Sequence, residues 1–113
     1  MKQGEIWLIC LDPTIGAEIS KSRPALIINT DSLGKLPLKI IAPITEWKEH
    51  YSNYPWMVKI IQTEQNNLSK ISAVDCFQIR SVSVDRFLNH IGIIEPKIFN
   101  NVQEAITKII SFI

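Results

Sequence analysis

Two polar side chains stand at the ends of apolar runs, where their chemistry would suit a phosphate group. Arg23 comes directly before Pro24 at the start of the run PALIINT, and Thr45 closes the short sequence Pro43-Ile44-Thr45. A guanidinium is a permanently charged, planar fork of donors, and a threonine hydroxyl can both donate and accept a hydrogen bond. If the fold brings a strand entrance and a strand exit together, this pair could hold and polarise a phosphate.

Each of the two residues also has a purely structural interpretation. An arginine at a strand edge often covers apolar surface with its aliphatic stem, and a β-branched threonine often closes a strand. The two residues alone leave both interpretations open.

The segment from Asp12 to Ser22 is long for a connection between neighbouring strands. Asp12-Pro13 and Gly16 favour turns, which also fits a solvated hairpin tip. Long ordered loops on small domains are often functional. A cationic zone follows, because residues 21–39 carry a charge of +3 although the whole chain has a net charge of only +1. Such a zone can attract a polyanion through weak, salt-sensitive contacts.

The pattern along the chain predicts mainly β structure followed by one helix. Short β-branched apolar runs are separated by Gly, Pro, Asn and Asp, which favours a small barrel or sandwich. After Pro96, a residue suited to a first helical turn, apolar residues recur every three or four positions. A further helical turn is expected to start at Ser83. The predicted strands are 6–11, 25–29, 38–42, 56–61, 73–79 and 91–94, and the apolar helix positions are Ile98, Val102, Ala105, Ile106, Ile109, Ile110 and Ile113.

A chain of 113 residues with 46% hydrophobic content is expected to form one domain, 1–113, around one core. Its N-terminal apolar stretch is broken by Glu5 and Asp12 and predicts neither a signal peptide nor a membrane span. Cys10 and Cys76 are far apart in the sequence and are expected to be buried thiols in a reducing cytoplasm. No His, Cys and acidic residues have the spacing of a metal site, so we expect neither a metal nor another cofactor.

Five segments, in order, resemble the MazF/PemK toxin family: GEIWLICLDPTIGAE, KSRPALII, PIT, SAVDCFQIRSVSVDRF and HIGII. The resemblance implies a small SH3-like β-barrel with a packed C-terminal helix. It also implies the toxin of a type II toxin-antitoxin system, which cleaves single-stranded RNA at a short sequence without a metal and leaves a cyclic phosphate. A homodimer is expected because the apolar content and the many isoleucines exceed what one small barrel can cover, and the cytoplasm is expected because no signal peptide or membrane span is predicted. The implied partner is an antitoxin whose acidic, partly disordered segment folds onto the toxin and blocks its groove.

Within this resemblance, Arg23 and Thr45 stand where the family has its catalytic residues. Arg23 would stabilise the phosphate and act in proton transfer, and Thr45 would orient the scissile group. The loop 12–22 would border the RNA groove, which gives Glu18 and Lys21 an RNA-binding role.

Aromatic residues gather after Thr45 in the segment EWKEHYSNYPW. Rings on a loop can stack on unpaired bases, which is the role we expect for Trp47, although ring packing at a barrel end is the open alternative. Trp56 begins an apolar run and is expected to pack. In the family that the chain resembles, this loop helps to select the cut sequence. His50 is expected on the surface, and His90 is expected to be structural.

Gln78 is expected to reach the RNA groove from the predicted strand 73–79, on the face that it shares with Arg80. Arg80 itself is expected to pair with Asp75 or Asp85.

Three positions depart from the family's pattern. Members often carry a small hydroxyl residue where this chain has Ala17, a Gln where it has Ile19, and an Asp where it has Phe77. The auxiliary roles of those positions are therefore not carried over.

Two other function classes share a barrel of this kind. A gyrase poison of the CcdB type is not a nuclease, and its family ends in Trp-Gly-Ile, whereas this chain ends in Ser111-Phe112-Ile113. A peptide- or nucleic-acid-binding barrel without activity is the other alternative, since a fold does not define a function.

Overall fold

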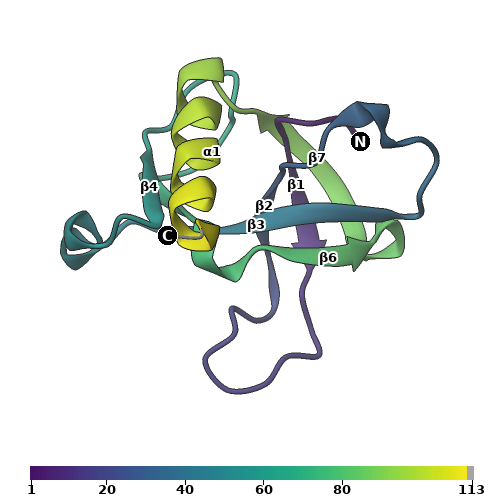
Figure 1. Cartoon of the computed structure of the whole chain (residues 1–113), viewed down its shortest axis with the longest axis horizontal. Coiled ribbons are helices and arrows are strands. Elements are labelled where there is room, and N and C mark those ends of the chain that lie inside the picture. The colour runs from purple at the N-terminus through teal and green to yellow at the C-terminus, as the bar shows by residue number, and fades with distance from the viewer. Residues whose placement is uncertain (112–113) are drawn as a thin grey trace.

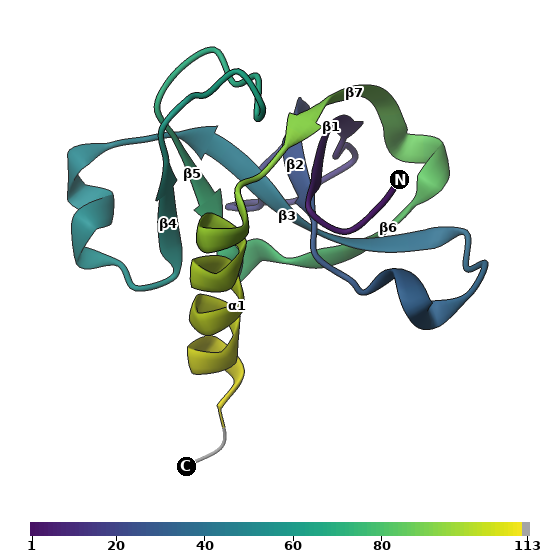
Figure 2. The ribbon, with the colours of Figure 1, turned by 90° about the horizontal axis from the view of Figure 1, so that it is seen from above.

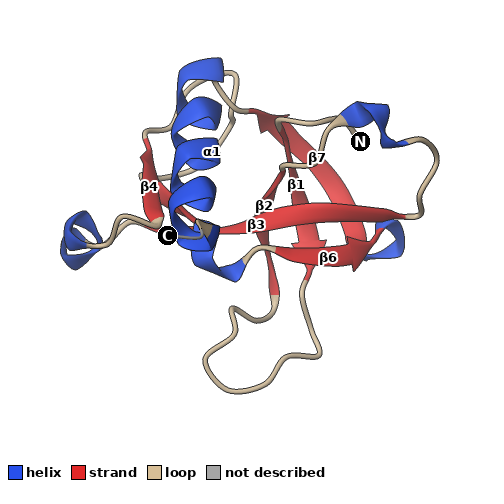
Figure 3. Ribbon diagram, viewed as in Figure 1, coloured by secondary structure: helices blue, strands red, loops and turns tan. Residues whose placement is uncertain are grey.

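A computed structural model describes residues 1–111 of the chain. Seven strands and one C-terminal helix are joined by loops that contain short 3₁₀ turns (Figures 1 and 3). No helix within residues 1–111 combines the length and the hydropathy that crossing a bilayer requires. The strands are β1 (Glu5–Cys10), β2 (Ser22–Ile27), β3 (Leu38–Glu46), β4 (Met57–Ile60), β5 (Ser72–Asp75), β6 (Arg80–Ser83) and β7 (Phe87–Ile93), and the helix is α1 (Pro96–Ile110).

The strands form one antiparallel sheet in the order β4-β5-β3-β2-β1-β7, and β6 pairs with the first half of β3. The sheet curves into a barrel-like shape, and α1 lies beside β4 and β5 at one side of it (Figure 2). This architecture confirms the predicted small SH3-like barrel with a C-terminal helix. Among the described residues the hydrogen-bonded order runs from β4 to β7 and does not close into a ring.

β3 changes its partner midway, and this change creates the space for a site. Residues 41–43 of β3 pair with β2, whereas residues 44–46 pair with β5. Pairing between β2 and β3 stops at Ala25 and Pro43, and Pro24 comes directly before Ala25. Because proline has no N–H to donate to a ladder, neither strand extends the pairing well beyond this point. The start of β2 and the end of β3 therefore separate.

Two hydrophobic clusters fill the two sides of β2 and β3. The larger cluster lies under α1, and the smaller one, on the opposite side, contains Ala25 and Ile41. Alternate residues of a strand point to the same side of the sheet. Arg23 therefore lies on the same side as Ala25, and Thr45 lies on the same side as Ile41. Both polar side chains therefore leave the sheet on one side, where the two strands separate.

The helix confirms the predicted C-terminal periodicity. Pro96 is in its first turn, and Val102 and Ala105 are buried against the sheet. The predicted position Ile113 lies outside the described residues. The helical turn expected at Ser83 is also present, because the Ser83 hydroxyl accepts a hydrogen bond from the N–H of Asp85 (3.1 Å).

The predicted strand 73–79 is wrong beyond Asp75. The Asp75 carboxylate accepts a hydrogen bond from the N–H of Phe77 (3.1 Å), which turns Cys76–Gln78 into a 3₁₀ turn. β6 then begins at Arg80, so Gln78 and Arg80 do not share a strand face. Each of the other predicted strands overlaps an observed one, although β7 begins before the predicted run 91–94.

The expected ion pair of Arg80 is wrong as well. Arg80 Nη1 donates to the carbonyl of Leu11 (3.2 Å) instead of an aspartate. The ion pairs found within residues 1–111 join other residues.

Candidate active site

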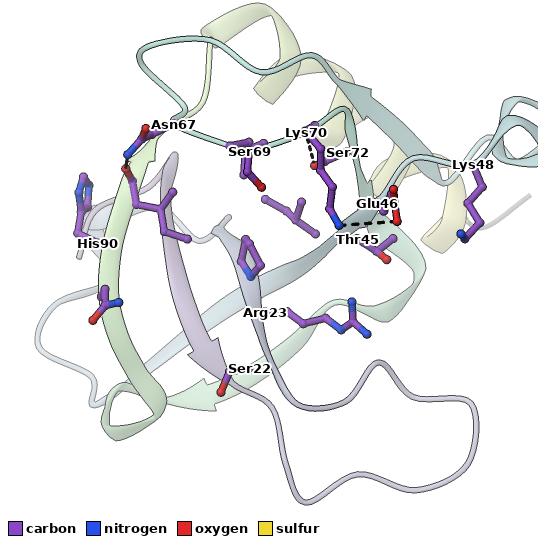
Figure 4. Close-up of a pocket in the computed structure, with 15 residues that line it drawn as sticks. Ser22, Arg23, Thr45, Glu46, Lys48, Asn67, Ser69, Lys70, Ser72 and His90 are labelled. Atoms are coloured by element: carbon purple, nitrogen blue, oxygen red, sulfur yellow. Dashed lines mark hydrogen bonds and ion pairs between the residues drawn. The ribbon is translucent and has the colours of Figure 1, made fainter.

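A pocket of about 640 Å³ lies where β2 and β3 separate. Arg23 and Thr45 both line it, together with Pro24 and Ile44. In the close-up, the Arg23 side chain extends from β2 towards the side of the pocket where Thr45 lies (Figure 4). The strand entrance and the strand exit therefore meet in one pocket, as the two residue positions suggested.

Arg23 is half-buried, and its guanidinium is fixed at one edge. Nε donates to the carbonyl of Ser20 (3.0 Å), at the end of the loop that leads into β2. No acceptor within residues 1–111 bonds to the two Nη groups. This arrangement leaves donors of a planar fork available for the oxygens of a phosphate.

Positive side chains predominate around the pocket. Arg23, Lys48 and Lys70 line it, against the single carboxylate of Glu46. Lys70 lies 3.7 Å from Glu46, but both side chains are exposed, so this pair is weak. Within residues 1–111 no three His, Cys, Asp or Glu side chains gather closely enough to hold a metal ion. The pocket is thus suited to an anionic ligand bound by cationic side chains.

The loop between β4 and β5, residues 61–71, covers one side of the pocket. Its conformation depends on the fully buried Asn66. Asn66 Oδ1 accepts hydrogen bonds from the N–H groups of Thr63 (2.9 Å) and Leu68 (3.1 Å), and Nδ2 donates to the carbonyl of Ile61 (3.0 Å). Leu68, Ser69 and Lys70 of this loop line the pocket beside Thr45.

Most of the pocket residues were not identified from the sequence as part of the site, among them Asn67, Asn89 and His90. His90, which we expected to be structural, is exposed, and its ring meets the edge of the Trp7 ring at 5.4 Å between centroids. The only signal in the sequence is the pair Asn66-Asn67, which favours a turn. That signal indicates a loop but not the pocket beside which it lies.

Glu18 and Gln78 lie in a second hollow, of about 480 Å³, and do not line the Arg23 pocket. The Gln78 amide is engaged with the loop 12–22, because Oε1 accepts from the N–H of Ile19 (2.7 Å) and Nε2 donates to the carbonyl of Ala17 (3.5 Å). The Glu18 carboxylate accepts from the N–H of Ile15 (2.6 Å) within the same loop. Both side chains thus shape the loop that leads to Arg23.

Lys21 lines neither hollow. It is exposed, and its φ of 68° lies in the left-handed region. Its N–H donates to the carboxylate of Asp12 (3.0 Å), which holds the chain in this turn two residues before Arg23.

Trp47 also lies outside both hollows, although Glu46 and Lys48 on either side of it line the Arg23 pocket. Its ring meets Tyr51 edge-on at 5.8 Å, and the Lys59 ammonium lies 5.0 Å from its centroid. The indole Nε1 is buried and has no acceptor within residues 1–111. These contacts are those of ring packing, the alternative left open by the sequence.

Burial changes the pKa of two neighbouring residues, Asp75 at the end of β5 and Cys76 directly after it. Burial raises the pKa of the Asp75 carboxyl above 3.8. Burial and the adjacent Asp75 charge raise the pKa of the Cys76 thiol to about 12. Because a thiol nucleophile must be deprotonated, Cys76 is inert near neutral pH. Cys10 is only half-buried, so the expectation of two buried thiols holds for Cys76 alone.

The fold and the pocket together define a small β-barrel with a cationic, hydroxyl-bearing site. Residues 2–110 match the model of a family described as the PemK-like, MazF-like toxin of type II toxin-antitoxin systems. Endoribonuclease MazF of Staphylococcus saprophyticus is 30% identical over 107 residues, which cover 94% of this chain and 88% of the relative. Endoribonuclease MazF9 of Mycobacterium tuberculosis is 27% identical over 112 residues, which cover 94% of this chain and 92% of the relative.

Solved structures have the same fold. MazF from Deinococcus radiodurans has a TM-score of 0.82 at 18% identity, with 99% of this chain and 97% of that chain covered. A mycobacterial endoribonuclease in complex with its cognate antitoxin has a TM-score of 0.74 at 15% identity, with 96% and 92% covered. The chain therefore belongs to the PemK-like, MazF-like toxin family of type II toxin-antitoxin systems. The comparisons do not favour the CcdB-like alternative or the inactive barrel.

Proposed function

We propose that this chain is a toxin that cleaves single-stranded RNA at a short sequence, without a metal ion. The observation that carries the proposal is the presence of Arg23 and Thr45 in one cationic pocket. Full-length relatives named as endoribonucleases support the choice of RNA as substrate.

The proposed reaction is an internal transfer at phosphorus. The 2′-oxygen of the ribose bonds to phosphorus, and the bond from phosphorus to the 5′-oxygen of the next nucleotide breaks. The 2′-hydroxyl loses a proton and the leaving 5′-oxygen gains one, so the products are a cyclic phosphate and a 5′-hydroxyl. Arg23 stabilises the charge that grows on the phosphate oxygens and takes part in proton transfer, and the Thr45 hydroxyl orients the scissile group.

Glu18, Lys21, Trp47 and Gln78 remain proposed RNA contacts. They lie outside the Arg23 pocket, so they would meet parts of the RNA strand beyond the scissile phosphate. Lys21, an exposed cation two residues before Arg23, would contribute mainly to affinity and to its salt dependence.

We further propose a cognate antitoxin as the protein partner and the cytoplasm as the place of action. The excess of cations in the pocket suits an acidic antitoxin segment, and similar folds have been solved as MazE–MazF complexes. A homodimer is expected because large apolar side chains near the start of β3 are exposed: Leu33, Leu36, Leu38 and Ile40. Sedimentation at micromolar concentration that showed only the 12.9 kDa monomer would contradict the dimer.

The function is tested by single-turnover cleavage of a long RNA in excess EDTA. The wild-type protein is expected to cleave, and Arg23→Lys, which keeps the charge but loses the planar fork, is expected to cleave at least about a hundredfold more slowly. Lys21→Ala serves as the matched control and should weaken RNA binding without slowing the step at saturating RNA.

Two results would contradict the proposal. One is cleavage that is lost in EDTA and restored by magnesium or manganese. The other is near-normal turnover by Arg23→Lys when circular dichroism shows both proteins folded.

A further inference from the structure

The Arg23 pocket has two ends of different chemistry. One end contains the charged side chains Lys48, Glu46 and Lys70, and the other is formed by Asn67, Asn89 and His90. In the close-up, His90 and Asn67 lie on the side opposite Lys48, with Arg23 and Thr45 between them (Figure 4). A strand of RNA whose phosphate sits at Arg23 would extend towards both ends.

The difference in chemistry suggests different tasks. Contacts to phosphates hold a nucleic acid in place, whereas contacts to base edges select its sequence. Asparagine amides present a donor and an acceptor side by side, the pattern that pairs with the edge of a base. Single-stranded RNA is recognised in this way through its exposed base edges, combined with stacking on rings. The uncharged end is therefore suited to a base.

The backbone holds Asn67 rigidly at this end. Its φ of 53° is in the left-handed region, which costs energy for a residue other than glycine. Its N–H donates to the carbonyl of Thr63 (2.9 Å), and Nδ2 donates to the carbonyl of Ile91 in β7 (3.2 Å). Oδ1 receives no hydrogen bond from the residues of the described chain. It remains an oriented acceptor at the pocket.

The loop that carries Asn67 is in close contact with β7. The N–H of Ile93 donates to the carbonyl of Gln65 (2.9 Å). A Cβ added to Gly92 would lie 2.4 Å from that same oxygen, so only glycine allows this approach. This close approach fixes the loop, and with it Asn67, against β7.

Asn89 and His90 lie on an irregular part of β7. They pair with Leu8 and Trp7 of β1, and the register between β7 and β1 shifts on both sides of this pair. Such irregularities redirect side chains and are common next to functional sites. The Trp7 ring supports the His90 ring from its edge, which leaves His90 exposed at the pocket.

We propose that Asn67, Asn89 and His90 form a subsite for the nucleobase next to the scissile phosphate, and that this subsite selects part of the cut sequence. The inference rests on the proposed ribonuclease function. The pocket volume of about 640 Å³ leaves room for a nucleotide beyond the phosphate position.

The test is cut-site sequencing on an RNA library with randomised bases, at short reaction times. Asn89→Ala and His90→Ala remove side chains from exposed positions, and Asn67→Gly removes the amide while keeping a residue that tolerates positive φ. Each change is expected to reduce the base preference at one and the same position beside the cut by about tenfold. Cleavage of the least favoured base at that position should change little.

Lys48→Ala is the matched control at the charged end, and it should weaken binding to all sequences alike. Two results would overturn the subsite while leaving the ribonuclease intact: an unchanged base preference in all three variants, or a uniform loss of rate across all sequences. A wild-type protein that cleaves no RNA would overturn the proposed function, and the subsite with it.

Discussion

The two loops on either side of Arg23 are held in place by different means. The loop 61–71 is supported mainly from within, because Asn66 bonds to backbone groups no more than five residues away, and two further bonds tie the loop to β7. The loop 12–22 has bonds of its own, from Lys21 to Asp12 and from Ile15 to Glu18, but it is also tied to distant side chains. Gln78 bonds to Ile19 across 59 residues, and Arg86 donates to the Asp12 carbonyl across 74 residues.

The two loops therefore differ in how much free energy a change of conformation would cost. The loop 61–71 contains a buried polar side chain whose loss would leave several backbone groups unpaired, so it can change only at a large cost. The loop 12–22 is mostly exposed, and Ile15 near its tip is 85% exposed. Its tip therefore has little packing, whereas its base is bonded to Gln78 and, through Ser20, to Arg23.

The largest effect is expected from Asn66→Ala. The change leaves buried N–H and carbonyl groups without partners, which costs about 1–3 kcal/mol for each group, so the free energy of unfolding should fall by about 3 kcal/mol. Urea denaturation measures this fall in the free energy of unfolding. The control is the neighbouring Asn67→Gly, which is exposed and should change stability by less than about 0.5 kcal/mol. A loss below about 1 kcal/mol for Asn66→Ala would mean that the loop has other support.

A smaller effect, on activity and not on stability, is expected from Gln78→Ala. Loss of its two bonds to the loop 12–22 should displace Ser20 and with it the Arg23 guanidinium, so kcat should fall about tenfold. The free energy of unfolding should fall by about 1 kcal/mol or less. Single-turnover kinetics and urea denaturation distinguish the two quantities.

Gln103→Ala, on the exposed face of α1, is the matched control for Gln78→Ala. An unchanged kcat together with a raised KM for RNA would assign Gln78 to substrate binding and not to the support of the loop.

The smallest effect concerns Asp75, the last residue of β5. Burial raises the pKa of Asp75 in the folded protein above 3.8, so the folded state binds a proton more tightly than the unfolded state. The contribution of Asp75 to stability is therefore greatest at low pH and declines as the pH rises through the raised pKa. Relative to the wild type, Asp75→Asn should become more stable as the pH increases from about 3 to about 7. If the urea midpoints of the wild type and Asp75→Asn changed in parallel across that range, the raised pKa of Asp75 would be contradicted.

Local patterns in the sequence predicted the strands around Arg23 and Thr45 and the helix α1, because apolar runs, prolines and helical spacing are local signals. The pairing of strand entrance with strand exit was only a possibility until the fold brought the two together. The resemblance to a family, and not the spacing of residues, then assigned the chemistry.

The errors in the prediction have physical causes. Asp75 ended a strand through a single side-chain bond to the backbone two residues ahead, which no apolar pattern reveals. No local pattern indicates that the Gln78 amide bonds to a loop 59 residues earlier, and its contact with RNA stays a prediction. Asn67 was not identified because its importance comes from a left-handed backbone and from contact with β7, both of which are properties of the folded chain.

The contact between Gly92 and the loop 61–71 has a consequence for the order in which the protein acquires activity during translation. Arg23 and Thr45 are synthesised early, but the wall formed by β7 is complete only once Gly92 has left the ribosome. A nascent chain that contains both residues but lacks β7 also lacks the part of the pocket that Asn89, His90 and Ile91 line. In the proposed function, a nascent chain therefore gains its complete RNA-binding pocket only after β7 has been synthesised.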